Sequence, residues 1–113
     1  ESQDSEEIVA SPRDLTPPEP PQGLAVVSGI GRVFLTWNEN RERDLAGYHV
    51  YRTDKSSGGE AERLTDVLIK RTTFSDETVK PGAVYIYWVT AVDRSGNESV
   101  RSREFKATLE TIR

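Results

Sequence analysis

The sequence predicts an all-β fold, a two-sheet antiparallel sandwich of seven strands. Apolar side chains recur at every second position in several runs, and these runs are rich in β-branched and aromatic residues, which is typical of strands. Turn-forming glycine, asparagine and proline residues separate the runs. Because no stretch has a helical period, the short strands favour two sheets packed face to face.

The alternation places each strand. The candidates lie near residues 22–28, 31–38, 46–53, 62–69, 71–76, 83–93 and 98–109. One or two strands can be drawn through residues 62–74, where the β-branched side chains disfavour a helix. One face of the alternation supplies the predicted core, which comprises Leu24, Val33, Leu35, Trp37, Tyr48, Val50, Phe74, Tyr87, Val89 and Ala91.

Composition excludes several classes of function. The 113 residues are enough for one domain with a core. The net charge of −4 argues against a nucleic-acid-binding surface, and no apolar run approaches the roughly 18 residues of a membrane span. Zero cysteines exclude disulfides, thiolate zinc sites and cysteine nucleophiles. With neither methionine nor a signal peptide, Glu1 is expected to begin an excised fragment.

The domain boundary is predicted near the proline cluster. Residues 1–16 are acidic and polar, and we interpret them as a linker or as the tail of a preceding domain. Residues 17–21 contain four prolines, which favour a stiff, extended connector. The folded domain is therefore predicted to span residues 17–113.

Four stretches follow one another in an order that points to a known family. PPQGLAV opens the first strand, VFLTW ends the second, DLAGYHVYR forms the third, and VKPGAVYIYWVTAVD contains the sixth. From Pro18 to Leu109 the sequence resembles a fibronectin type III domain, which implies an immunoglobulin-like sandwich. The wording of these stretches is similar to modules of bacterial secreted and surface proteins.

The resemblance also implies roles for single residues. In the family, a tyrosine corner bonds a phenol to the backbone a few residues upstream. Its positions are held here by Val79, Pro81, Gly82 and Tyr85, with valine replacing the usual leucine. The third strand departs from the family pattern, because Arg52 stands where an aromatic residue is common. Tyr51 is then expected to point outward.

No group of residues matches a catalytic or cofactor site, so we expect a domain without enzyme activity, cofactor or metal. His49 has no motif partners and is interpreted as a surface histidine. The acidic pairs Glu42/Asp44, Glu60/Glu62 and Asp76/Glu77 are interpreted as solvated loop charges.

The stretch DRSGNES, residues 93–99, could form a binding loop or a tight turn. Asp93, Asn97 and Glu98 offer oxygens to a cation, but Gly96 and Asn97 are typical turn residues, and the turn is the preferred interpretation. The Arg-Gly-Asp triplet of some animal members is absent.

A set of aromatic and apolar side chains remains on the outer face of the predicted sheet: His49, Tyr51, Ile86 and Trp88. An exposed patch of this kind is a candidate partner-binding face. Two alternatives are cross-strand pairing that stabilises the sheet, and cover by the 1–16 segment through Ile8, Val9 and Leu15.

The best functional interpretation is a non-catalytic structural or protein-interaction module of a larger, secreted or cell-surface protein. The resemblance implies an extracellular, periplasmic or cell-surface location. The expected partner is protein, either an adjacent domain or another chain, with no nucleic acid and no membrane contact. The alternative is a carbohydrate-binding accessory module of a polysaccharide-active protein, in which Trp88 and Tyr51 would form the sugar platform.

Overall fold

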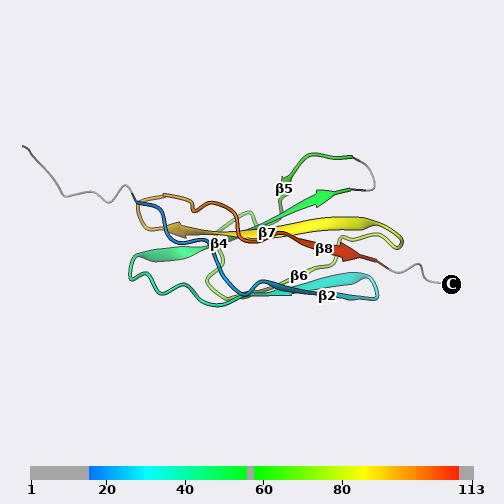
Figure 1. Cartoon of the computed structure of the whole chain (residues 1–113), viewed down its shortest axis with the longest axis horizontal. Helices are drawn as coiled ribbons and strands as arrows, with labels where there is room; N and C mark the ends of the chain where they lie inside the picture. The colour runs from blue at the N-terminus through cyan, green and yellow to red at the C-terminus, as the bar shows by residue number, and fades with distance from the viewer. Residues whose placement is uncertain (1–15, 56–57, 110–113) are drawn as a thin grey trace, which may run out of the picture.

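The computed structural model describes residues 16–55 and 58–109, and within them the chain forms two antiparallel sheets without a helix. The strands are β2 (Ala25–Gly29), β3 (Arg32–Thr36), β4 (Leu45–Asp54), β5 (Glu62–Arg63), β6 (Thr73–Asp76), β7 (Val84–Asp93) and β8 (Phe105–Thr108). One sheet has the order β2-β3-β6 and the other β5-β4-β7-β8. The strands run along the long axis of the molecule (Figure 1). The predicted all-β sandwich is confirmed, while the predicted linker over residues 1–16 lies outside the described residues except for Thr16.

The core lies between the sheets and follows the period of two. In the long β4–β7 pair, Tyr48 faces Ala91 and Val50 faces Val89, and all four side chains are fully buried. The other predicted core residues are buried as well, except that Phe74 is half-buried and packs against the edge of the core. The core also contains Ala83, Tyr85, Ala107 and Leu109.

The predicted strand 62–69 is much shorter in the structure. Only Glu62–Arg63 pairs with β4, and the chain then crosses toward the other sheet, touching β4 again at an isolated bridge between Tyr48 and Ile69. The crossing passes so close to Gly47 that a Cβ there would lie 2.8 Å from the Ile69 carbonyl oxygen. Gly47 follows a register shift in β4, so the absence of a side chain lets the crossing pass.

The predicted strand 98–109 is also shortened, with a regular ladder only over Phe105–Thr108. Upstream, two serine side chains bond to the backbone of β7. Ser99 Oγ accepts the Ala91 N–H at 2.9 Å, and Ser102 Oγ accepts the Val89 N–H at 3.0 Å. Their own backbone N–H groups return to the carbonyls of the same two residues, at 2.8 and 2.9 Å. Because Ser99 and Ser102 lie three positions apart, the segment runs beside β7 without the spacing of a strand.

Candidate functional site

The DRSGNES stretch forms a turn closed by Asp93. Its Oδ1 accepts the N–H groups of Ser95 at 3.0 Å and Asn97 at 2.8 Å, and its Oδ2 accepts the Asn97 side-chain amide at 3.1 Å. Gly96 has φ of +89°, a conformation that glycine adopts without strain. Burial opposes ionisation of Asp93, but the hydrogen bonds from Asn97, Ser95 and Gly96 outweigh it and hold its pKa below the ordinary value. The Asp93 carboxylate therefore accepts hydrogen bonds from groups of the turn itself.

The outer face of the β4–β7 pair holds the predicted aromatic cluster. Tyr51 lies directly opposite Trp88 in the register, and the two rings stack with centroids 5.7 Å apart and planes 6° apart. His49 meets the Tyr51 ring edge-on at 6.4 Å. Ile86, opposite Thr53, is half-buried farther along the same face. The structure therefore brings the four residues onto one face.

That face is not the exposed apolar patch that the sequence predicts. Trp88 is only 5% exposed, and the guanidinium of Arg101 lies over its ring with Cζ 4.0 Å from the centroid. Arg101 comes from the segment between β7 and β8, whose path depends on the bonds of Ser99 and Ser102. The expectation of an open Trp88 is therefore wrong, because a neighbouring cation and Tyr51 cover the ring.

His49 is also buried, so its interpretation as a surface histidine is wrong. Its Nδ1 lies 2.7 Å from Thr65 Oγ1, and that hydroxyl oxygen accepts the Val50 N–H at 3.3 Å. The hydroxyl hydrogen can then be donated to Nδ1, which suits a neutral imidazole. Burial lowers the pKa of His49, and the nearby Arg63 guanidinium lowers it further, while Glu98 acts in the opposite direction.

Glu98 binds two hydroxyl groups of the outer face of the β4–β7 pair. Both the Tyr51 and the Thr90 hydroxyls donate to Glu98 Oε2, at 2.5 and 2.6 Å. Burial would raise the pKa of Glu98, but the hydrogen bonds from Thr90 and Tyr51 outweigh it and leave the pKa lowered. Glu98 therefore serves the cluster as an anion held by two hydroxyls, a role that alternation alone could not reveal.

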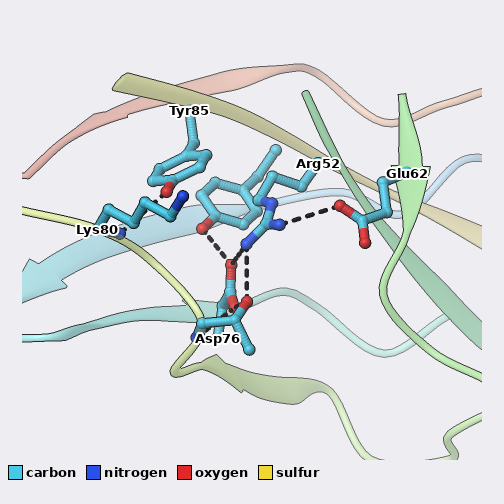
Figure 2. A network of polar contacts seen from close by, with 7 residues as sticks. Arg52, Glu62, Asp76, Lys80 and Tyr85 are labelled. Carbon is cyan, nitrogen blue, oxygen red and sulfur yellow. Dashed lines mark hydrogen bonds and ion pairs between the residues drawn. The ribbon is translucent and has the colours of Figure 1, made fainter. Parts of the chain in front are cut away.

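A second polar cluster lies between the sheets, where Arg52 takes the inward position that the family usually gives to an aromatic residue (Figure 2). Its Nη1 bonds Asp76 Oδ2 at 2.9 Å and Thr78 Oγ1 at 2.9 Å, and its Nη2 bonds Glu62 at 3.0 Å. The Tyr87 hydroxyl donates to the same Asp76 oxygen at 2.5 Å.

Asp76 is the centre of this cluster and is only 3% exposed, so its interpretation as a solvated loop charge is wrong. Burial would raise the pKa of Asp76, but hydrogen bonds from Tyr87 and Thr78, together with the charge of Arg52, hold it below the ordinary value. Sequence reasoning missed this cluster. The available signal was an arginine in phase with Tyr48 and Val50, since a buried guanidinium needs a carboxylate.

The tyrosine corner has the geometry that the resemblance implies. The Lys80 N–H donates to the Tyr85 hydroxyl at 3.0 Å, five residues upstream (Figure 2). Gly82 has φ of +77°, and its N–H bonds the Leu109 carbonyl at 3.1 Å. Val79 packs half-buried against the core. This corner joins the β6–β7 connection to the end of β8.

A hollow lies at the end of the sandwich that holds the proline-rich entry segment. Its volume is about 410 Å³, and it is lined by Glu19, Pro20, Gln22, Asn38, Glu39, Asn40, Arg41 and Glu42. The Asn40 side chain donates to the Glu19 carbonyl at 2.7 Å and to Glu42 Oε1 at 3.1 Å. The Glu19 N–H, which bonds Glu42 Oε2 at 2.8 Å, lowers the pKa of Glu42. The hydrogen bonds among Glu19, Asn40 and Glu42 thus tie the entry segment to the β3–β4 loop.

The described residues contain no group of three or more histidine, aspartate or glutamate side chains placed to hold a metal ion. No helix among them is long and apolar enough to cross a membrane.

Comparison with known proteins identifies the family. No family model matches the chain. A solved Fn3-like protein from Clostridium thermocellum is 30% identical, and the alignment covers 85% of this chain and 97% of that one with a TM-score of 0.68. The chain belongs to the fibronectin type III family. This fibronectin type III domain shares its fold with chicken CNTN1 FN1-FN3 domains, at a TM-score of 0.73 and 20% identity over 84% of this chain and 32% of that one.

Curated relatives place similar sequences inside much larger proteins. Amylopullulanases from Thermoanaerobacterium thermosulfurigenes and Thermoanaerobacterium saccharolyticum are 38% identical over 87 and 90 residues, which is 77% and 80% of this chain. The fibronectin type III domain spans only 4% and 7% of the length of these two proteins. The stretches that match this chain are therefore short segments of long proteins.

Proposed function

We propose that this fibronectin type III domain is a non-catalytic accessory module of a larger, extracellular, polysaccharide-active protein, in which it spaces and contacts neighbouring domains. The observation that carries the proposal is the likeness over about four fifths of the chain to short segments of amylopullulanases. The extracellular location fits a substrate polysaccharide that lies outside the cell, because such a polymer is too large to cross the membrane before it is degraded.

The chemistry of the described residues supports a role without catalysis. His49 is buried against Thr65, and the carboxylates of Asp76, Asp93 and Glu98 are held by internal hydrogen bonds. A catalytic site needs a nucleophile or base that converges with a second group on an accessible substrate position. These side chains instead stabilise the sheets.

The carbohydrate-binding alternative requires an accessible aromatic platform. The Trp88 ring is enclosed by Tyr51 on one side and by Arg101 on another, so a sugar ring would have to displace the arginine to stack on it. We infer that the cluster of His49, Tyr51, Ile86 and Trp88 stabilises the β4–β7 sheet by cross-strand packing. A neighbouring domain would meet the rim of this face, where Arg101 is half-exposed.

The decisive experiment uses the 113-residue chain itself. We expect no release of reducing sugar from pullulan or soluble starch, and no retardation in native gels that contain either polymer. Tryptophan fluorescence should stay unchanged in maltooligosaccharide, because Trp88 is covered. Hydrolysis would disprove the non-catalytic role. Retardation together with a fluorescence change, both lost in Trp88→Phe, would establish the carbohydrate-binding alternative.

A further inference from the structure

The β2–β3 hairpin carries an apolar surface that the fold does not use. Among the described residues, the exposed large apolar side chains are Val27, Ile30, Phe34, Val67 and Val100, and the first three lie on this one hairpin. Val27 and Phe34 are cross-strand partners on the outer face of the sheet, 62% and 44% exposed. Ile30 sits at the tip of the turn and is 84% exposed. These three residues are called the hairpin surface below.

The turn itself does not require an isoleucine at its tip. Gly31 supplies the positive φ of +72° that the turn needs, and a polar residue would serve equally well at the neighbouring position. The other side chains on the outer face around Val27 and Phe34 are Arg32 and four short ones, Ala25, Thr36, Thr73 and Ser75. Ser75 Oγ donates to Glu77 Oε2 at 3.4 Å, so a carboxylate borders this face. The hairpin surface is thus an apolar strip with Arg32 and Glu77 as the charged side chains near it.

Its size indicates what kind of partner it can hold. The three side chains together expose on the order of 300 Å², whereas a stable complex of separate proteins buries about 800 Å² on each partner. A partner tethered to the same polypeptide needs far less contact, because a short linker raises its effective concentration to the millimolar range. The small area therefore favours a tethered partner.

The position of the hairpin surface indicates which part of the polypeptide that partner is. Leu109, the last described residue, is held by two hydrogen bonds, one from its N–H to the Ala83 carbonyl at 2.9 Å and one from the Gly82 N–H to its carbonyl at 3.1 Å. The β2–β3 turn and the C-terminal end of β8 lie at the same end of the sandwich (Figure 1). The described chain therefore ends at the same end of the sandwich as the turn that carries Ile30.

We propose that the hairpin surface of Val27, Ile30 and Phe34 is the docking site for the domain that follows this module in the same polypeptide. This inference rests on the proposed function, in which the module is one part of a longer protein. The docked domain would present an apolar patch next to its own first residues, and the contact would fix the angle between the two domains.

The test compares the full-length protein with the isolated module. Ile30→Ser and the double variant Val27→Ser/Phe34→Ser are the probes, and Val67→Ser is the matched control because Val67 is 72% exposed and lies outside the hairpin. Limited proteolysis of the linker after the module reports docking. We expect Ile30→Ser to speed cleavage of the linker in the full-length protein by at least about tenfold, the lower limit of the factor that corresponds to losing the burial of one isoleucine. Val67→Ser should leave the cleavage rate unchanged.

The isolated module separates docking from folding. Its unfolding midpoint should be the same in the original chain, in Ile30→Ser and in Val67→Ser, since Ile30 and Val67 are 84% and 72% exposed. Equal linker cleavage in all full-length variants would overturn the inference, and so would a gene that encodes no domain after the module. Self-association of the isolated module that Ile30→Ser abolishes would assign the surface to a second copy instead. Starch-gel retardation lost in Val27→Ser/Phe34→Ser would assign it to a glucan. Equal linker cleavage in all full-length variants leaves the proposed accessory role intact, and so does a gene that encodes no domain after the module.

Discussion

Replacing Asp76 with asparagine removes the negative charge that faces the buried guanidinium of Arg52. The pair lies 2.9 Å apart, with 12% of the Arg52 side chain and 3% of the Asp76 side chain exposed. Removing one partner of a buried ion pair costs about 3–5 kcal/mol, because the other charge stays desolvated. Glu62, which is 61% exposed, still bonds Arg52, so the lower end of that range applies. We expect Asp76→Asn to lose about 3 kcal/mol of unfolding free energy, or roughly 12–24 °C in midpoint for a domain of this size.

The assay is urea unfolding at pH 7 followed by tryptophan fluorescence. Asp66→Asn is the control, because Asp66 is exposed, and its unfolding free energy should stay within about 0.5 kcal/mol of the original. Arg52→Met completes a double-mutant cycle, in which we expect a coupling free energy of about 2 kcal/mol between Arg52 and Asp76. A coupling below about 0.5 kcal/mol, or an unchanged stability of Asp76→Asn, would refute the view that this pair holds the sheets together.

The same pair predicts how stability depends on acid. Because the pKa of Asp76 is lowered on folding, the unfolded chain binds more protons than the folded one between the two pKa values. The contribution of Asp76 is therefore complete above the unfolded pKa of about 3.9 and is lost as pH falls through the lower folded value. The stability difference between the original chain and Asp76→Asn should shrink toward pH 2. A constant difference from pH 7 to pH 2 would contradict the lowered pKa.

Three further predictions concern single side chains. Tyr85→Phe removes the bond from the Lys80 N–H and should cost about 1 kcal/mol in urea unfolding, and an unchanged midpoint would show that the corner bond contributes nothing. Arg101→Ala uncovers the Trp88 ring, so tryptophan emission should shift to the red and acrylamide quenching should rise, with a loss of about 0.5–2 kcal/mol; unaltered quenching would mean that the arginine does not cover the ring. Burial, the charge of Arg63 and the opposing charge of Glu98 leave the pKa of His49 lowered, so its contribution to stability is complete above the unfolded pKa of about 6.5 and is lost as pH falls through the lower folded value. His49→Gln should remove that part of the pH profile, and a profile that keeps its slope would argue against a buried neutral histidine.

The core could be predicted from the sequence because burial follows the period of a strand. Val33 and Leu35 on one strand, and Val50 and Val89 on two others, are in phase, and all four are fully buried. Alternation assigns each side chain to a face by local geometry alone. It also placed Tyr51 and Trp88 on a common face, and the structure pairs them directly.

The low exposure of Trp88 on that outer face could not be predicted, because it depends on a segment whose apolar and polar residues do not alternate. Ser99 and Ser102 bond β7 through their hydroxyls, and this path brings Arg101 over Trp88. Likewise, phase predicts that Arg52 points inward, but only the stacking of the two sheets brings Asp76 to it. The misjudged exposures, those of Trp88, Asp76 and His49, all arise from contacts between segments distant in sequence.

The arrangement of β2 and β8 has a mechanical consequence. The entry segment and the C-terminal end lie at opposite ends of the sandwich, so tension between neighbouring domains pulls along the strands (Figure 1). Hydrogen bonds in an antiparallel pair lie perpendicular to the strands, so the β8–β7 register from Val84↔Thr108 to Tyr87↔Phe105 is loaded in shear. The β2–β3 register is loaded in the same way. The bonds of each pair must then yield together instead of opening one after another, so the fold resists a force applied between its two ends.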